Sequence, residues 1–404
     1  MKKKKNEGIK MNWKHFLLVV SVVACSVILS CDNETKLTFP PEDVVNRITD
    51  SYFFKDGKTF MYLNSNMNRK YDFGSLVIVE IDEKSGLSYL DSLIVPSLSG
   101  KMVVNSKEDT VYVTTRDLHG VVRVKISGKQ GAYRLSYPDE TDGNIPKILK
   151  TKKEPYAVIL NEDEDKLFVT HLLGGELTIV DLEKWELIET YKLKYGVTDI
   201  VFDSNSGFYI ASHKSSGNIS LIDIFESSLS GLTVGVSESE LGLPTDGYDM
   251  RSLKISADGT SLYASFQNYS DDEDEDSAPQ LLKFTLTGKK KTEVEILQTV
   301  PLKGSLGEIA VFPFTTGEEE NEYNGELIFA TSPGEKSLYI VDSGRGEMIE
   351  SIIFKKCEPY QLSTLKTGKT EGLLSISCFA QDNLHLYKVD VSKKELLTDI
   401  GEIK

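Results

Sequence analysis

The sequence is poor in the residues and motifs that mark most catalytic sites. Its 404 residues include only 2 Trp, 4 Cys and 5 His. A Cys-x-x-Cys-His haem motif, a Gly-x-Ser-x-Gly nucleophile turn and a glycine-rich phosphate loop are all absent from it. With only 12 Pro and 30 Gly, it is not a low-complexity chain either. The sequence therefore indicates no particular catalytic reaction and no cofactor.

Net positive charge is also missing. The formal charge is −16, and because the first 30 residues carry six Lys and one Glu, the rest of the chain is more acidic still. An acidic surface repels phosphate backbones and anionic lipid headgroups. We therefore expect no nucleic-acid partner, and the ordinary consequence of this acidity is solubility.

One long apolar run lies near the N-terminus. Six lysines between Lys2 and Lys14 precede the run FLLVVSVVACSVILS, residues 16–30. It is shorter than the roughly 20 residues that a membrane-spanning helix needs, and it matches the apolar core of an export signal. The run ends at Cys31, and Ile28-Leu29-Ser30-Cys31 resembles the lipobox of bacterial lipoproteins, in which a small residue precedes a cysteine that becomes acylated.

We therefore predict a lipoprotein signal peptide at residues 1–30, lipidation at Cys31 and a flexible tether over residues 31–45. Cys25 is a competing acylation site, but it would leave an apolar stub on the mature protein; an uncleaved signal anchor is the other alternative. Several acyl chains, at about 0.8 kcal/mol per buried CH₂, anchor a protein firmly. The lipid on Cys31 would then attach the protein to a membrane. The protein would be located in the bacterial cell envelope, on the periplasmic face or the cell surface.

The body of the chain, residues 46–404, alternates short β-rich runs with Gly, Asn, Asp and Ser turns. The pattern recurs in seven units. One of them, Tyr156–Leu193, reads as strand, Asp-rich turn, strand, Gly-Gly turn, strand and strand. Four-stranded units that recur at such a period are typical of propeller blades. We predict an all-β domain, a single seven-bladed β-propeller of four-stranded antiparallel blades; six or eight blades are the alternatives, because the first and last units are the least regular.

The second strands of these units share a motif. It reads VYVTT at 111–115, LFVTH at 167–171, FYIAS at 208–212 and LYASF at 262–266. These strands resemble the YVTN family of β-propeller repeats, and the chain looks closest to its YncE-like bacterial lipoproteins. The resemblance implies the propeller fold but no single function, since propellers host enzymes, electron-transfer partners and binding modules.

Two histidines end second strands of adjacent units, His171 and His213. We expect them, with Arg116, to be candidate channel residues; His171, Arg116 and Asp199 are the set that lactonase-like chemistry would use. A zinc or copper site would need further ligands at a recognisable spacing. The sequence shows none, so we expect no metal site.

Cys357 and Cys378 are the only cysteines after Cys31. Export permits a disulfide between them, and a buried free thiol in the apolar run LLSISCF is the alternative. The contiguous acidic residues 271–276 and 318–320 lack the glycine and the spaced ligands of a calcium loop. We expect them to be solvated loops.

These observations favour a membrane-anchored, non-catalytic binding or scaffolding module with a protein or small-ligand partner in the envelope. Irregular insertions near residues 225–250, 269–279 and 315–325 would supply its specificity. The alternative is a periplasmic propeller hydrolase of the lactonase-like kind, or a redox-associated enzyme, using the central channel.

Overall fold

The structure is a computed structural model in which the chain forms two units, Met1–Thr38 and Phe39–Lys404. It describes residues 37–82, 86–138, 146–193, 196–214, 219–227, 233–241, 248–268, 280–285, 295–302, 304–317 and 323–403. The predicted signal peptide, Cys31 and the acidic runs 271–276 and 318–320 lie outside these residues. Among the residues that it does describe, no helix is long and apolar enough to cross a membrane.

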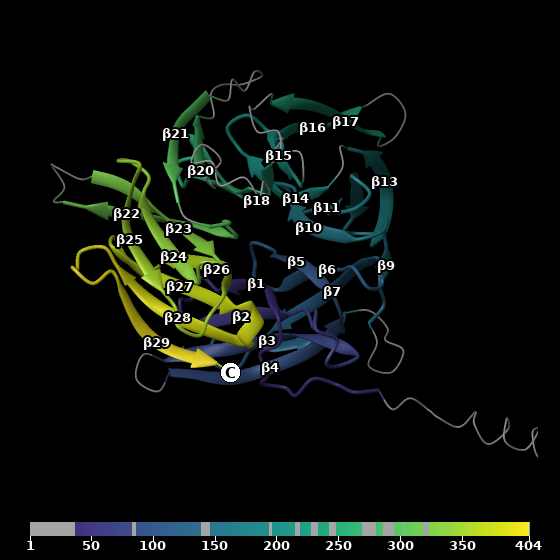
Figure 1. The fold of residues 1–404 in the computed structure, drawn as a ribbon. Helices are drawn as coiled ribbons and strands as arrows, with labels where there is room; N and C mark the ends of the chain where they lie inside the picture. Colours follow the sequence, from purple (N-terminus) through teal and green to yellow (C-terminus); the bar gives the residue numbers. More distant parts are fainter. Residues whose placement is uncertain are drawn as a thin grey trace, which may run out of the picture. The chain divides into compact units, whose positions relative to one another are not determined.

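The unit Phe39–Lys404 consists of seven antiparallel sheets, each built from strands that are consecutive in the sequence (Figure 1). Blade 1 consists of β1 (Ile48–Phe53), β2 (Thr59–Asn64), β3 (Phe73–Asp82) and β4 (Gly86–Pro96). Blade 2 consists of β5 (Ser99–Val104), β6 (Thr110–Thr115), β7 (Gly120–Ser127) and β8 (Arg134–Ser136), with β9 (Leu149–Lys150) paired to β7. Blade 3 consists of β10 (Pro155–Leu160), β11 (Lys166–His171), β12 (Glu176–Asp181) and β13 (Glu186–Lys192).

Blades 4 to 7 repeat the same order. Blade 4 consists of β14 (Val197–Asp203), β15 (Phe208–His213), β16 (Ile219–Ser227) and β17 (Thr233–Leu241), and blade 5 of β18 (Tyr248–Ile255), β19 (Ser261–Asn268), β20 (Gln280–Thr285) and β21 (Glu295–Pro301). Blade 6 consists of β22 (Ile309–Thr316), β23 (Tyr323–Ser332), β24 (Ser337–Asp342) and β25 (Glu347–Ile353). Blade 7 consists of β26 (Pro359–Lys366), β27 (Glu371–Cys378), β28 (Asn383–Asp390) and β29 (Leu397–Ile403). The described residues hold no α-helix, only the short 3₁₀ turn η2 (Phe379–Gln381).

The first strand of each blade lies innermost, and these strands form a closed ring. Each contacts the next in the order β1, β5, β10, β14, β18, β22, β26, and β26 contacts β1 again. This confirms the predicted fold, an all-β propeller with seven blades. One detail was wrong: β17 and the flanking ends of β16 and β18 lie in residues 225–250, which we expected to be an irregular insertion. The outermost strand of a blade needs no second apolar face, so the polar composition of TVGVSESEL is compatible with a strand.

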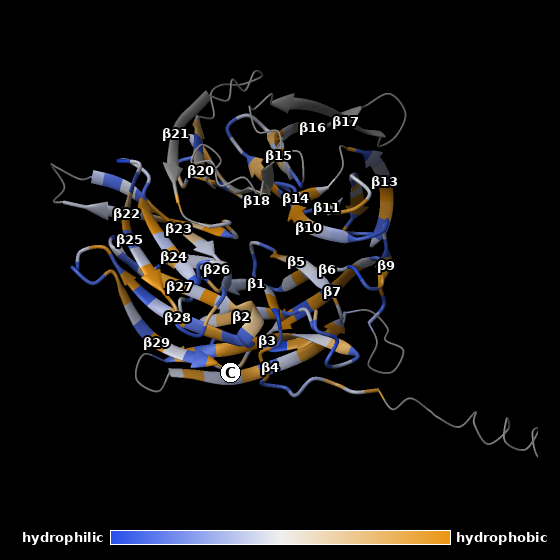
Figure 2. Cartoon of the chain, in the orientation of Figure 1, coloured by the Kyte–Doolittle hydropathy of each residue, from blue (hydrophilic) through white to orange (hydrophobic). Residues whose placement is uncertain are grey.

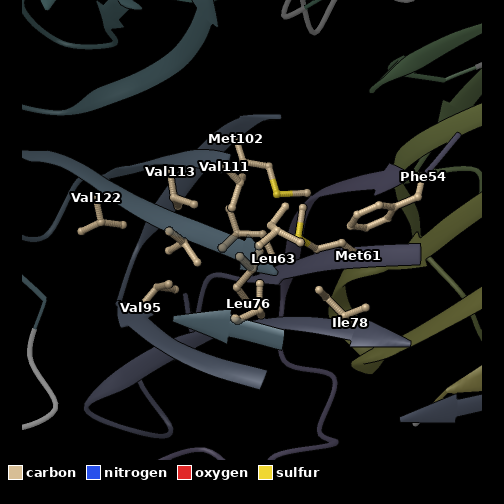
Figure 3. Close-up of a cluster of buried hydrophobic side chains, with 13 residues drawn as sticks. Phe54, Met61, Leu63, Leu76, Ile78, Val95, Met102, Val111, Val113 and Val122 are labelled. Atoms are coloured by element: carbon tan, nitrogen blue, oxygen red, sulfur yellow. The ribbon is translucent and has the colours of Figure 1, made fainter. Parts of the chain in front are cut away.

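Apolar side chains between adjacent blades hold the ring together. Figure 3 shows the cluster between blades 1 and 2, where Met61, Leu63 and Ile78 pack with Met102 and Val111. The middle strands need two apolar faces because they lie between two neighbouring blades; β2 is buried at every position, whereas the outermost strand β25 is almost entirely exposed. Figure 2 shows the same division, with hydrophobic residues along the strands and hydrophilic residues in the connecting turns.

The recurring hydroxyl of the second-strand motif joins one blade to the next. Thr114 Oγ1 donates to the carbonyl of Tyr156 in the following blade at 2.9 Å. Ser265 donates in the same way to Gly307 at 2.7 Å, and Thr331 to Tyr360 at 3.2 Å. The innermost strands of blades 3, 6 and 7 are thus tied to the blade before them.

Blades 7 and 1 close the ring without exchanging a strand. Ser51 Oγ donates to Gln361 Oε1 at 2.8 Å, and Arg47 Nη1 donates to the Phe379 carbonyl at 2.7 Å. A hydrophobic cluster that includes Tyr62 and Leu384 fills the space between the two sheets. Side chains alone therefore complete the ring that positions the channel.

Candidate binding cavity in the propeller channel

The innermost strands share a β-bulge near their first residues. The register with the second strand shifts between Ile48 and Asp50, Ser99 and Met102, Pro155 and Val158, Val197 and Asp199, Met250 and Ser252, and Pro359 and Leu362. A bulge leaves a residue without a ladder partner and turns its side chain away from the alternation of the strand. Six blades therefore place a re-aimed side chain at the same level of the channel.

Blade 6 reaches the same arrangement without a register shift. Thr331 Oγ1 donates to the Glu308 carbonyl at 3.2 Å, as Thr114 Oγ1 does to the Lys101 carbonyl at 3.0 Å. A Cβ on Gly307 would lie 2.6 Å from the Thr331 hydroxyl, and a Cβ on Gly100 equally close to the Thr114 hydroxyl. Each glycine is therefore needed for the close approach of this hydroxyl to the bulge.

Aligning the seven strands at this point defines two rings of residues around the channel. The first ring is Thr49, Gly100, Tyr156, Thr198, Arg251, Gly307 and Tyr360. The second ring, one residue further along each strand, is Asp50, Lys101, Ala157, Asp199, Ser252, Glu308 and Gln361. The rings carry most of the polar chemistry of the channel.

The first ring lines a cavity of about 370 Å³, which we call the strand-start cavity. All its members but Gly100 contribute, with Lys101 and Glu308 of the second ring and the turn residues Pro333 and Gly334. The neighbouring Tyr360 and burial raise the pKa of Tyr156, so its phenol stays neutral and can donate a hydrogen bond. Hydroxyls, two aromatic rings and the Arg251 guanidinium thus surround one small space.

The second ring forms a layer of paired charges beneath this cavity. Lys101 Nζ lies 3.2 Å from Asp199 Oδ2 and 3.3 Å from Glu308 Oε1. Lys254, two residues beyond the second ring in blade 5, places its Nζ 3.1 Å from Glu308 Oε1, and the Ser252 hydroxyl donates to the same oxygen at 2.9 Å. This network joins blades 2, 4, 5 and 6 across the channel.

The charges in this layer shift one another's pKa values. Burial disfavours the charged form of Lys101, but Asp199, Glu308 and Asp50 outweigh it and hold the Lys101 pKa well above its usual value. Burial likewise opposes ionisation of Glu308, but Lys101 and Lys254 lower its pKa to about 2. The ammonium and carboxylate groups of this pair are therefore both charged at neutral pH.

Asp50 differs from the other carboxylates of the layer. Burial raises its pKa to about 6, despite the opposing effect of Lys101 and of a hydrogen bond at 2.8 Å from the Met102 amide. Asp199 accepts a hydrogen bond at 3.0 Å from the Leu253 amide, which has the same position in blade 5 as the Met102 amide has in blade 2. Both carboxylates therefore tie one innermost strand to another, but Asp50 changes its charge near pH 6.

A second cavity of about 430 Å³ lies on the other side of the charged layer, and we call it the strand-end cavity. Asp50, Asp199 and Lys254 line it together with apolar side chains such as Val158 and Ile200. Lys101 and Glu308 line both cavities. The Lys101–Glu308 pair therefore separates the two.

The structure places the histidines inside their own blades. His171 and His213 are fully buried and line neither cavity. His171 Nε2 contacts the Thr178 hydroxyl at 2.9 Å, and His213 Nε2 contacts the Ser220 hydroxyl at 2.8 Å, both on the next strand of the same blade. Burial lowers the His171 pKa. Both imidazoles thus satisfy buried polar groups within a sheet.

Arg116 also lies outside both cavities, where its Nε forms a 2.5 Å ion pair with Glu154. Of the proposed lactonase-like set, only Asp199 lies in the channel, and its partners are Lys101 and Ser252 instead of His171 and Arg116. Cys357 and Cys378 form a disulfide in blade 7.

Of the residues in the two channel rings, only Asp199 was predicted from the sequence as a candidate site residue. In the sequence, the ring residues are visible only as polar residues at the second or third position of a β-strand, as in ITDSYF, SGKMVV and VTDIVFD. Such residues look like ordinary solvent-facing positions of an alternating strand.

Comparisons with known proteins support the fold and leave the family open. No family model matches the chain, and no curated protein matches it. Membership of the YVTN family therefore stays a prediction.

Solved structures do resemble it. A Bacteroides fragilis protein provisionally named a 6-phosphogluconolactonase has a TM-score of 0.64 at 14% identity, over 87% of this chain and 97% of that one. The periplasmic gluconolactonase of Pseudomonas aeruginosa gives 0.59 at 13%, over 85% and 95%. The hydrazine synthase of Kuenenia stuttgartiensis gives 0.60 at 11%, over 88% and 97%. These likenesses support the propeller fold of the chain, and identities this low show nothing further.

Proposed function

We propose that the protein is a non-catalytic binding module of the cell envelope whose ligand site is the strand-start cavity. The observation that carries this proposal is the first ring, in which five of the seven blades turn a side chain into the same cavity of about 370 Å³. That volume is in the usual range for small-molecule sites. The strongly charged groups beneath the cavity are paired with each other, which suits a rigid floor better than a reacting group.

The lining indicates a small, hydroxylated, anionic ligand. The Arg251 guanidinium suits a carboxylate or a phosphate, and the Tyr156 phenol can donate a hydrogen bond. The Thr49 and Thr198 hydroxyls donate to the Ser99 and Met250 carbonyls, so their oxygens remain as acceptors for hydroxyl groups of a ligand. The tyrosine rings supply apolar contact on one side. Sugar acids have this combination, and two of the structural neighbours are named for activity on lactones of sugar acids.

Calorimetric titration of the purified protein with gluconate and with 6-phosphogluconate tests the proposal. We expect saturable binding that weakens at least about tenfold in Arg251→Met, because a bidentate charge-assisted contact is lost. Arg345→Met is the matched control, since Arg345 is an exposed arginine outside the channel. Equal affinities in the wild type and Arg251→Met, or no binding of either ligand at millimolar concentration, would contradict the proposal.

A lactone hydrolase is the second candidate. The observation that favours it is Asp50, a channel carboxyl whose pKa of about 6 suits a general base near neutral pH. Proton release from glucono-lactone above the spontaneous rate, abolished in Asp50→Asn, would establish this activity. Anchoring through Cys31 is a separate prediction, checked by fatty-acid labelling of the wild type and of Cys31→Ala.

A further inference from the structure

A second group of chemically reactive side chains lies in blade 7, outside both channel cavities. Cys357 precedes β26, Cys378 ends β27 and His385 lies on β28. One sulfur or nitrogen atom from each lies within 4.8 Å of the others. Two thiol sulfurs and an imidazole are the ligands that zinc prefers in proteins.

The strand register adds a carboxylate to this group. Cys378 is opposite Asn383, and His385 is opposite Glu402 on β29. Because residues two apart on a strand share a face, Cys378, Asn383, His385 and Glu402 all project from the same face of blade 7. His385 Nε2 lies 3.8 Å from Glu402 Oε1. Cys357, Cys378 and His385 therefore form one cluster of potential zinc ligands, and Glu402 lies beside its imidazole as the nearest candidate for a fourth.

Asn383 provides an independent indication of a ligand here. Its Nδ2 donates to Glu402 Oε1 at 2.6 Å, which fixes the carboxylate next to His385. Its Oδ1 is buried and has no hydrogen-bond partner in the described part of the chain. A buried polar atom without a partner is costly and calls for an explanation, and a water hydrogen-bonded to a zinc-bound Glu402 would supply a donor to it.

We propose that blade 7 holds a redox-controlled zinc site, formed by Cys357, Cys378, His385 and Glu402 when the Cys357–Cys378 disulfide is reduced. In the oxidised protein the two sulfurs are bonded to each other, and no thiolate is present to bind the metal. The oxidised and the zinc-loaded forms therefore exclude one another.

The chemistry of the switch balances with a dithiol as reductant. Its two thiols become a disulfide, and the two electrons and two protons pass to Cys357 and Cys378. Zinc then binds the two thiolates, and the two thiol protons are released to solvent. Reduction and zinc concentration together thus set the state of the site.

The surroundings hold the imidazole and the sulfurs close to the required arrangement. The His385 ring stacks with Phe354 and with Tyr387, at centroid distances of 6.4 and 6.3 Å. The Cα atoms of Cys357 and Cys378 are 4.9 Å apart. Only the sulfur atoms need to separate by side-chain rotation, whereas the strands that carry them remain paired.

Zinc titration of the full chain in competition with a chromophoric chelator tests the proposal. The disulfide is first opened by a water-soluble phosphine, which becomes a phosphine oxide, and new thiols are counted by alkylation and mass measurement. We expect one zinc per chain in the reduced protein and none at this site in the oxidised one. Cobalt in place of zinc should give a thiolate-to-metal charge-transfer band.

Variants separate this site from other zinc ligands. Cys357→Ser/Cys378→Ser should lose the zinc and the cobalt band, which excludes Cys25 and Cys31 as the source. His385→Gln leaves both cysteines in place and should weaken zinc binding at least about tenfold, whereas His119→Gln, a matched change in blade 2, should not. The proposal is overturned if the disulfide resists the phosphine in the folded protein, or if His385→Gln binds zinc as tightly as the wild type.

Discussion

The two cavities of the channel are built from the same seven strands but differ in chemistry. The strand-start cavity is lined by hydroxyls, two tyrosines and Arg251, whereas the strand-end cavity adds Val158, Ile200 and Leu362 to the carboxylates of its floor. The difference follows from the β-bulges, because a bulge frees a side chain from the alternation that packing imposes further along the strand. The Thr49 and Thr198 hydroxyls also join their blades to the next, so Arg251 is the first-ring position at which we expect a change to alter the ligand site with least effect on the blade interfaces.

The charged layer between the cavities is under the opposite constraint. Lys101 and Glu308 contact both spaces and pair with each other, so a change in either affects the whole layer. The layer should be sensitive to substitution, and the first ring less so, apart from Gly100 and Gly307, where a Cβ would meet a hydroxyl. Three substitutions test this difference.

Lys101→Met should have the largest effect. It removes one of two ammonium groups from a layer that also holds Asp199 and Glu308. Leaving a buried carboxylate without its partner typically costs about 3–5 kcal/mol. We expect a loss of that size in the free energy of unfolding, measured by urea denaturation at pH 7.

The double variant Lys101→Met/Glu308→Gln is the control for this prediction. It leaves Lys254 3.9 Å from Asp199, with Asp50 as the other carboxyl group of the layer, and so reduces the excess of negative charge that Lys101→Met alone creates. The double variant should therefore lose less than the sum of the two single changes. Strict additivity would mean that Lys101 and Glu308 do not act as a unit and would contradict the description of a coupled layer.

Asp50→Asn should come next, and its effect should depend on pH. Because the folded pKa of Asp50 is raised from 3.8 to about 6, the folded state binds a proton more tightly than the unfolded state. The resulting stabilisation is present below pH 3.8 and is lost as pH rises through 6. Asparagine does not titrate, so the stability of Asp50→Asn relative to the wild type should rise by up to about 3 kcal/mol between pH 4 and pH 8.

Unfolding free energies of both proteins at several pH values measure this difference. Glu308 has the opposite sign, since its pKa is lowered to about 2 and its contribution is lost as pH falls from 4.5 towards 2. Glu308 and His171 are present in both proteins, so their contributions cancel in the difference, which between pH 5 and pH 8 reports Asp50. A constant difference over that range would show that Asp50 is not the titrating group.

The sequence was sufficient for the fold because each blade repeats the same apolar pattern. Strands such as β6 and β11 are buried along nearly their whole length, and this continuous apolar character recurs seven times. The rings of the channel could not be predicted in the same way. The polarity of Asp50 or Lys101 is evident in the sequence, but which of seven strands oppose each other, and at which level, depends on ring closure and on the bulges.

The histidines show the converse limitation. His171 and His213 end second strands, so they lie at the same face of the propeller as the starts of the innermost strands, opposite Pro155 and Val197. They are nevertheless one strand away from the channel, and their imidazoles face Thr178 and Ser220 of the third strand. The position of each histidine at the end of its strand could be predicted from the sequence. The direction in which its side chain points could not.

Thr114→Val should have the smallest effect of the three and should act at the starts of two innermost strands. It removes the one hydroxyl that donates to the Lys101 carbonyl in blade 2 and to the Tyr156 carbonyl in blade 3, and it keeps the shape of the side chain. A single neutral hydrogen bond contributes about 1 kcal/mol to stability, and Thr367→Val, an exposed threonine, should change it by less than about 0.5 kcal/mol. Amide hydrogen exchange should rise at the start of β10, around Tyr156, and stay unchanged at its end, around Leu160. Equal changes at both ends of the strand would mean that this hydroxyl stabilises the blade as a whole, and that the bulges do not give the strand-start cavity its own structural control.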